Sequence, residues 1–501
     1  MESTRVEKPH ALCFPLPAPG HINPLMHLAK ILHARGFYIT FVDTEFNHER
    51  ITRSGGAMEL NNLEDFKLES IPDGLPPDHG RTQDAAGLID AMMKNFFSPF
   101  RDLVSKLNDS IQVPPLTCII SDLNFTQVVA EELGIARICL WVTSSAAFWG
   151  FLHYFELIKR GIVPFKHLDR GDCPSRQVGP NRLPPLEKTH IVDVVVLANA
   201  DENFMTNGDQ KQLDLPSFIW TTNLNDPMLQ VCTIESPKTL KSSAIILNTF
   251  KDLDKHVLDA MRERIGRPIY TIGPVASFSQ FESNDRLKSV SMSLWNEEDT
   301  CVEWLNDKKP KSVVYVNFGS VTVATPNQLN EFAWGLVNSQ RPFIWVIRED
   351  LVFGKSATLE KTFVEETKER GLILSWCNQI KVLSHPANST IESISNGVPM
   401  ICWPFFGDRP TICRYVCKEW GIGMEINNDV KREEVKTLVR ELMEGEKGKE
   451  MQLKAKKWKE ISKTVVQLGG SSYNNLEAYK ASASRETLIK STCSHIYLFN
   501  V

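Results

Sequence analysis

Two residues whose side chains could move a proton follow apolar runs in the N-terminal part of the chain. His21 lies in the segment APGHINP, after the run at residues 10–15, and Asp122 comes directly after the run LTCIIS. The carboxyl ends of parallel strands meet at one edge of a sheet, where open α/β sheets bind ligands. A histidine whose second nitrogen bonds a carboxylate is fixed in one tautomer and can act as a general base. From spacing alone, the plainer interpretation is favoured, in which His21 caps a helix and never meets Asp122.

A second group of candidate residues lies in the C-terminal half. The turn Gly319-Ser320 and the segment Asn388-Ser389-Thr390, before a short predicted helix, could offer backbone N–H groups to a phosphate. Trp376, at the end of a predicted strand, could stack on a nucleobase, and Glu392 could accept a hydrogen bond from a ribose hydroxyl. Each residue also has a plainer explanation, as a turn, a cap, a buried tryptophan or a solvated glutamate, and taken alone the plainer explanation is favoured.

The elements that must position these residues alternate between strands and helices. The apolar run at 10–15 is followed by a helical pattern over 23–34, with apolar residues three or four apart, and by a second apolar run at 37–42. This order is the βαβ unit of a parallel sheet. Further strands are predicted at 116–121, 244–250, 269–274, 312–317, 343–347, 372–376 and 400–403. We therefore predict two doubly wound α/β domains in series, each with an open parallel sheet.

Local signals divide the chain further. Residues 275–300 are polar and rich in serine, which is typical of a linker. Thr325, Pro326 and Gln328 form a capping-box start for the next helix. The predicted division, listed in chain order, is an N-terminal domain over 1–274, a linker over 275–300, a C-terminal domain over 301–462, a helix over 463–480 that crosses back to the first domain, and an atypical tail over 481–501.

Composition excludes several classes of protein. The 501 residues are 42% hydrophobic and 23% charged, which is globular composition rather than that of a disordered or fibrous chain. A net charge of −5 argues against a general nucleic-acid-binding surface. The 11 cysteines form no CxxC pair, and the N-terminus has no signal-peptide pattern, so we expect reduced thiols and a cytoplasmic location. No run of 18 apolar residues occurs, and we expect no membrane span.

Motifs of rival enzyme classes are also missing. The sequence contains no GxGxxG, GxxxxGK[ST], HExxH or GxSxG. These absences argue against a dinucleotide dehydrogenase, a P-loop enzyme, a zincin and an α/β-hydrolase. A nicotinamide-dependent oxidoreductase on a similar fold is therefore a remote alternative, because its fingerprint is missing.

Longer segments resemble one family. The segments SWCNQIKVLSHPA and NSTIESISNGVPMICWPFFGDRPTICRYVCKEWGIGMEI resemble the signature box of plant family 1 UDP-dependent glycosyltransferases, as does the N-terminal segment FPLPAPGHINPLMHLAKILHARGFYITFVDTEFNHERI. The resemblance covers most of residues 9–165 and 212–475 and is nearest to the subgroup of cyanohydrin and iridoid glucosyltransferases. It implies the GT-B fold, in which two Rossmann-like domains face a cleft.

The resemblance also implies roles for individual residues. His21 matches the general base that deprotonates the acceptor, and Asp122 matches the acid that orients it. The residues that match the UDP-sugar-binding positions are Ser320, Trp376, Gln379, Asn388, Ser389, Glu392, Asp408 and Arg409. The implied reaction is inverting transfer of glucose from UDP-glucose to a hydroxyl or carboxyl of a small lipophilic metabolite. It requires no metal or other cofactor, and we expect the protein to act as a cytoplasmic monomer.

The sequence departs from the family pattern at one main point. The family has about ten residues of the form IGGFLTHCGW where Ala387 is joined directly to Asn388. The helix predicted at 380–385 is thus followed at once by the next helix, with no residues left for the strand between them. We predict that one strand of the C-terminal sheet is missing. The missing piece also carries a histidine that binds the diphosphate in the family, so the alternative function is an impaired pseudoenzyme or small-molecule binder that has lost UDP-sugar binding.

Smaller departures affect specificity and geometry. Arg409 stands where the family usually has a sugar-binding glutamine, and an arginine can only donate hydrogen bonds. The loop SDLNFT is about two residues shorter than in the family, which could shift Asp122 relative to His21. Residues 166–211 and the tail over 481–501 do not match the family.

Overall fold

The N-terminal half is built around one parallel sheet of seven strands. The computed structural model describes residues 8–53, 60, 63–76, 81, 85–159, 161, 163, 216–217, 221, 223–282, 287, 290, 293–295, 297–298, 300–352, 359–384, 390–405 and 407–496. The sheet has the order β3-β2-β1-β4-β5-β6-β7. Its strands are β1 (His10–Phe14), β2 (Tyr38–Thr44), β3 (Phe66–Ile71), β4 (Leu116–Ser121), β5 (Ala136–Trp141), β6 (Ala244–Leu247) and β7 (Ile269–Thr271).

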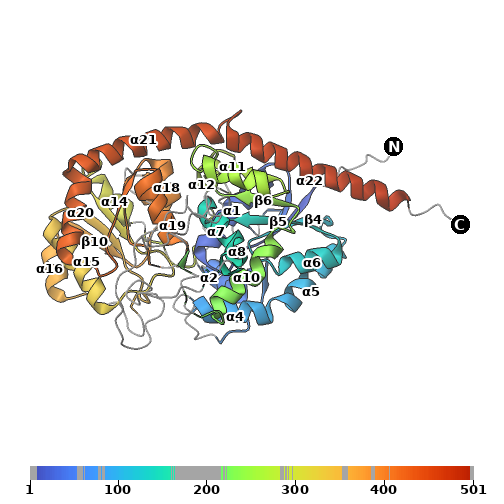
Figure 1. The fold of residues 1–501 in the computed structure, drawn as a ribbon, viewed down its shortest axis with the longest axis horizontal. Coiled ribbons are helices and arrows are strands. Elements are labelled where there is room, and N and C mark those ends of the chain that lie inside the picture. The colour runs from blue at the N-terminus through green and yellow to red at the C-terminus, as the bar shows by residue number, and fades with distance from the viewer. Residues whose placement is uncertain are drawn as a thin grey trace.

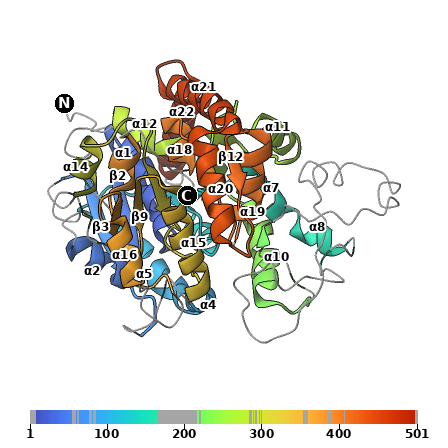
Figure 2. The same cartoon turned by 90° about the vertical axis from the view of Figure 1, so that its left-hand side faces the viewer.

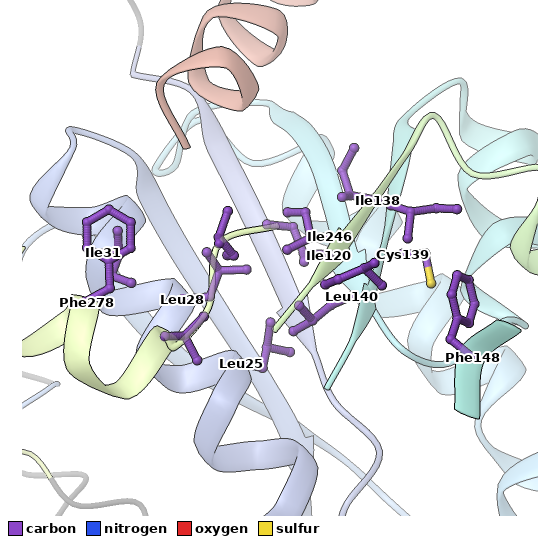
Figure 3. Packing of buried hydrophobic residues seen from close by; sticks show 14 of the residues in the cluster. Leu25, Leu28, Ile31, Ile120, Ile138, Cys139, Leu140, Phe148, Ile246 and Phe278 are labelled. Carbon is purple, nitrogen blue, oxygen red and sulfur yellow. The ribbon is translucent and has the colours of Figure 1, made fainter. Parts of the chain in front are cut away.

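Helices follow most of these strands, as the βαβ pattern predicts (Figure 1). They are α1 (Pro19–Ala34), α2 (Glu45–Arg53), α4 (Ala85–Asn95), α5 (Phe97–Asn108), α6 (Thr126–Leu133), α7 (Ser145–Leu152), α8 (Tyr154–Lys159), α10 (Pro227–Thr239), α11 (Lys255–Arg264) and α12 (Val275–Glu282). The apolar residues of α1 that recur at helical spacing face the sheet, and Figure 3 shows Leu25 and Leu28 beside Ile120 of β4 and Ile246 of β6. The buried face of α1 therefore fixes this helix on the centre of the sheet.

The stretch predicted as a linker is more ordered than its composition indicates. Residues 275–282 form α12, which packs against α1, and Phe278 is completely buried beside Ile31 (Figure 3). The serine-rich composition does not indicate this contact, because only four residues of α12 are buried. The exact domain boundaries stay predictions.

The C-terminal half repeats the layout but splits it into two small parallel sheets. One sheet has the order β10-β9-β8 and the other pairs β11 with β12. The strands are β8 (Val314–Asn317), β9 (Phe343–Val346), β10 (Gly371–Leu374), β11 (Met400–Cys402) and β12 (Gly423–Glu425). The helices are α14 (Thr300–Asn306), α15 (Pro326–Ser339), α16 (Lys361–Thr367), α17 (Gln379–Ser384), α18 (Thr390–Asn396), α19 (Arg409–Arg414), α20 (Arg432–Glu444), α21 (Glu446–Val466) and α22 (Ser471–Ile496).

A comparison of the two halves shows which strand is lacking. In the first sheet, β4 lies between β1 and β5 at the centre. By the same order, the C-terminal half should have a strand between β8 and β11, contributed by chain between α17 and α18. Only residues 385–389 separate those two helices, and within the described part of the chain β8 pairs only with β9 and β11 only with β12. Among the described residues, no strand lies between β8 and β11, in agreement with the prediction.

The gap changes the burial of the strands on either side of it. Every residue of β1 and β4 is buried, whereas every residue of β8 and β11 is only partly buried. A cavity of about 790 Å³ has β8 and β11 in its lining. Fully burying one large aliphatic side chain contributes about 1.5–3 kcal/mol, so incomplete burial of these strands weakens the centre of the C-terminal half.

The C-terminal helices connect the two halves. Helix α20 packs against α15 on the outer face of the second half (Figure 2). In Figure 1, α21 runs along the second half and α22 continues over the first, where it contacts β7 and β4. Asn475 of α22 donates to the carbonyl of Thr271 at 3.0 Å. Among the described residues, no helix is both long and apolar enough to cross a membrane.

Hydrogen exchange will report the split sheet. We expect the amides of β8 and β11 to exchange at least about 100-fold faster than those of β1 and β4, which equals about 2.7 kcal/mol of opening free energy. The physical reason is that, among the described residues, no strand pairs with the second edge of β8 or of β11. Mass spectrometry of deuterium uptake by peptic peptides measures this difference, and equal protection in the two halves would show that the gap has no energetic effect.

Candidate active site

His21 lies in the first turn of α1. Ala18 has extended backbone angles, and its carbonyl accepts the N–H groups of His21 at 2.8 Å and Ile22 at 2.9 Å. Pro19 is the first helical residue, where its fixed φ suits the helix and no donor is lost. The predicted start at Asn23 is therefore four residues late, and His21 is held by a helix rather than by a loop.

Asp122 is brought to His21 by the pairing of β1 with β4. The register places Phe14 opposite Ser121, so the next residue, Asp122, lies beside the chain that leaves β1. Its Oδ1 accepts the backbone N–H of Leu16 at 2.7 Å, and its Oδ2 lies 2.5 Å from Nδ1 of His21. The plainer interpretation, that the two residues never meet, is wrong, and the shortened loop after Asp122 does not separate them.

This hydrogen bond determines which nitrogen of His21 can act. With Nδ1 donating to Asp122, Nε2 is left to accept a proton. The side chain of His21 keeps 29% of its surface exposed and that of Asp122 only 8%. A partly exposed base supported by a buried carboxylate is the arrangement that general-base catalysis requires.

The charges around His21 favour its protonated form. Burial alone lowers the pKa of His21, but the charge of Asp122, the hydrogen bond that His21 donates to it and the charge of Asp408 together raise this pKa above the usual 6.5. Asp408 belongs to the other half of the protein, directly before α19. Carboxylates from both halves therefore stabilise an imidazolium at this position.

Two oxygens of cavity-lining residues have no hydrogen-bond partner among the residues that the structure describes. Oδ2 of Asp408 and the hydroxyl of Thr143 are both buried without a hydrogen bond, and both residues line the cavity. Thr143 follows β5 in the N-terminal half. A buried polar atom without a partner is costly, so both oxygens are positions at which a ligand hydroxyl could donate a hydrogen bond.

The turn after β8 is held by side chains around it. Gly319 has a φ of 73°, which favours glycine, and its N–H donates to Oδ1 of Asn317 at 2.7 Å. The amide of Asn317 also donates to Oε1 of Gln379 at 3.0 Å, and Arg348 donates to the carbonyl of Gly319. Ser320 thus lies on an ordered turn at the cavity wall, beside Gln379.

Arg409 is turned toward the same turn. Its Nη1 donates to the hydroxyl of Thr322 at 2.8 Å, and its other terminal nitrogen lies 3.4 Å from where a Cβ on Gly319 would be. Burial lowers the pKa of Arg409, the charge of Asp408 opposes this shift, and the charge of Arg348 adds to it. A half-buried guanidinium with a neighbouring cation favours an anionic ligand at this wall of the cavity.

Trp376 is half-buried and stacks on another tryptophan. The rings of Trp376 and Trp295 are 4.3 Å apart between centroids, with an interplanar angle of 28°. Trp376 follows β10 and also lines the cavity, and its carbonyl accepts the N–H of Glu298 at 3.2 Å. The Trp295 contact fixes the plane of a ring that could carry a base on its other face.

The structure brings five of the ten predicted site residues to the wall of one cavity, and His21 and Asp122 are not among its lining residues. These five are Ser320, Trp376, Gln379, Asp408 and Arg409. Asn388 and Ser389 lie outside the described residues, and Glu392 lies on α18 with its side chain outside the description. Four residues at the site were not predicted from the sequence: Thr143, Trp295, Asn317 and Arg348. The only available signal was for Asn317, which ends an apolar strand before a glycine turn.

Comparison with known proteins identifies the family to which this chain belongs. The sequence profile described as UDP-glucoronosyl and UDP-glucosyl transferase matches residues 298–458. A 7-deoxyloganetin glucosyltransferase of Catharanthus roseus is 46% identical over 500 residues, which cover 94% of this chain and 96% of that protein. The chain is a member of the UDP-glycosyltransferase family. Linamarin synthase 1 of Manihot esculenta, another relative, is 44% identical over 94% of this chain and 96% of its own length.

Solved structures agree on the fold of this UDP-glycosyltransferase. The crystal structure of Os79 from O. sativa in complex with UDP has a TM-score of 0.73 at 25% identity, covering 94% of this chain and 100% of that one. The structure of Phytolacca americana UGT2 with UDP-2fluoro-glucose and pterostilbene has a TM-score of 0.68 at 24% identity, with 95% and 100% covered. The predicted GT-B fold is confirmed.

Replacing Asp122 will test the electrostatics of the dyad. In Asp122→Asn we expect the pKa of His21 to fall, because burial lowers this pKa and the carboxylate charge that raises it is removed. We also expect kcat to fall by about 10⁴, because the imidazole loses the partner that fixes its tautomer. An NMR titration of the His21 ring measures the pKa. The matched control is Asp109→Asn, an exposed carboxylate at the opposite edge of the sheet. An unchanged His21 pKa in Asp122→Asn would contradict the assignment.

Proposed function

We propose that this UDP-glycosyltransferase transfers glucose from UDP-glucose to a hydroxyl or carboxyl of a small lipophilic plant metabolite, with inversion at the anomeric carbon. The observation that carries the proposal is the hydrogen bond between His21 and Asp122. Gly20 and Asn23, which flank His21 on α1, line a cavity to which both halves contribute. Relatives with 46% and 44% identity are named as a 7-deoxyloganetin glucosyltransferase and a linamarin synthase, which supports glucose as the sugar and a small metabolite as the acceptor.

The reaction follows from the dyad. Nε2 of His21 takes the proton of the acceptor hydroxyl as its oxygen attacks the anomeric carbon from the face opposite UDP. The bond between that carbon and the phosphate oxygen breaks, and UDP leaves with the electron pair. Asp122 and Asp408 stabilise the imidazolium that forms. When the acceptor is a carboxylate, no proton needs to be removed, and His21 then only positions it.

The donor would occupy the wall formed by the C-terminal half. Trp376, with Trp295 on one face, would stack on uracil, and Gln379 would lie beside it. The unpartnered oxygens of Asp408 and Thr143 would accept hydrogen bonds from sugar hydroxyls. The diphosphate would lie at the turn of Ser320, near the guanidinium of Arg409. The remaining proposed donor contacts, at positions not described, are Asn388 and Ser389 to the diphosphate and Glu392 to the ribose.

Further properties belong to the same proposal. We expect transfer to need no metal ion, because the donor N–H groups of the Ser320 turn and the charge of Arg409 would stabilise the leaving UDP. A chelator would then leave turnover unchanged. We also expect a cytoplasmic monomer.

The split sheet favours one alternative. If the gap between β8 and β11 prevents donor binding, the protein is a catalytically impaired binder whose N-terminal half still holds an acceptor. Nothing in the comparisons supports this alternative. It predicts saturable binding of a lipophilic acceptor without any release of UDP.

The transfer assay tests the proposal. UDP release from UDP-glucose is measured in EDTA against a panel of small lipophilic alcohols and carboxylic acids, and NMR of the product gives the anomeric configuration. We expect acceptor-dependent release and a β-glucoside product. We expect His21→Ala to lower the rate with alcohols by about 10²–10⁴, because a general base contributes that much. The control His256→Ala, exposed on α11, should keep full activity. Unchanged turnover in His21→Ala would remove the base assignment.

A further inference from the structure

Three cysteines, one from each of three elements in the C-terminal half, lie close together. Cys402 ends β11, Cys413 lies on α19, and Cys417 lies in the π-helical turn Tyr415–Glu419 that continues α19. Their Sγ atoms all lie within 4.8 Å of one another, and those of Cys413 and Cys417 are 3.9 Å apart. All three are thiols rather than disulfides.

The spacing of the sulfur atoms matches a metal centre. Sulfurs bound at about 2.3 Å to one cation lie about 4.0 Å apart in a trigonal plane and about 3.8 Å apart in a tetrahedron. The distance between Cys413 and Cys417 already lies between these values. The longest pair in the cluster needs to close by less than about 1 Å, which side-chain rotation can supply. A disulfide would join only two of the three sulfur atoms, whereas a single cation can be bound by all three.

The cluster is enclosed but reachable. Cys413 is buried, and Cys402 and Cys417 are half-buried. Cys402 and Cys413 both line the cavity that contains Asp408, so a small cation can reach the sulfurs through it. The missing strand beside β11 is part of the reason that Cys402 borders this space.

We propose that Cys402, Cys413 and Cys417 form a binding site for one soft, thiophilic cation, with monovalent copper as the best match. Thiolate sulfur selects Cu(I) and zinc over harder cations such as Mg²⁺, and three sulfurs in a triangle suit Cu(I), which needs no fourth ligand. The nearby carboxylate of Glu425 on β12 is a hard oxygen ligand and is not required. This site is separate from the His21–Asp122 dyad, and no step of sugar transfer uses it.

The pKa values of the Cys402 and Cys413 thiols are both raised above the usual value. Hydrogen bonds to Cys402 and Cys417 first, and burial next, raise the pKa of the Cys413 thiol. Binding of a cation therefore displaces thiol protons into solvent, and no change of oxidation state is involved. Because Cys413 is one turn beyond Arg409 on α19, a bound cation would join α19 to β11 next to the donor wall.

A competition titration with Cu(I) tests the site. Full-length reduced protein is mixed under argon with Cu(I) and a chromophoric Cu(I) chelator, and the number of copper ions retained per chain is counted. We expect one tightly held ion, which is lost in Cys402→Ser, Cys413→Ser and Cys417→Ser. The matched control is Cys232→Ser, a buried thiol on α10 outside the cluster, which should keep the ion. Retention of the ion in all three cluster variants would overturn the proposal, as would its absence in the native protein.

A second measurement needs no variant, in case a serine at buried Cys413 prevents folding. X-ray absorption at the copper edge of the loaded native protein should show three sulfur neighbours at about 2.3 Å. Two sulfurs in a linear arrangement, or oxygen and nitrogen neighbours, would contradict the three-cysteine site. The thermal unfolding midpoint of the native protein should also rise with Cu(I), since a ligand that binds only the folded state stabilises it.

Discussion

The pairing of β1 with β4 is the constraint on which the active site depends. It places Asp122 one residue beyond β4, next to the chain that leaves β1. Both oxygens of the Asp122 carboxylate then form hydrogen bonds to residues of that chain. One oxygen fixes the loop through Leu16 and the other fixes His21. A slip of one residue in this register would turn Asp122 to the other face of the sheet and leave His21 without its partner. The fully buried strands and the apolar face of α1 make such a slip costly.

The C-terminal half positions its site residues on smaller sheets whose strands are less buried. Its sheet lacks the strand that would correspond to β4, and its central strands are only partly buried. The donor-side residues are nevertheless held by contacts that do not use the missing strand. Asn317 joins the Ser320 turn to Gln379, Arg348 fixes Gly319, and Trp295 orients Trp376. The hydrogen bond between His21 and Asp122 does not depend on these C-terminal contacts, whereas the stability of the C-terminal half is the weak point of the molecule.

Local patterns in the sequence predict most of the fold. The capping box at Thr325 is present with both of its hydrogen bonds, and the short chain between two predicted helices is enough to indicate the missing strand. The start of α1 is misplaced because Pro24 suggests a helix beginning there, whereas Pro19 is the first helical residue. Contacts between distant residues carry no local signal, so neither the stacking of Trp295 on Trp376 nor the effect of Asp408 on His21 could be predicted from spacing. Strand-end geometry suggests that His21 and Asp122 meet, but only the register of β1 on β4 decides it.

The central claim is that the donor half still binds a UDP-sugar although its sheet is split. Calorimetric titration of UDP into the native chain tests this claim most directly, with Trp376→Ala as the comparison because it removes the stacked ring without touching the gap. The account predicts saturable binding of one UDP per chain and an affinity at least about tenfold weaker in Trp376→Ala, since stacking on an aromatic ring contributes about 1–3 kcal/mol. No binding of UDP by a chain that circular dichroism shows to be folded would contradict it and favour the impaired binder.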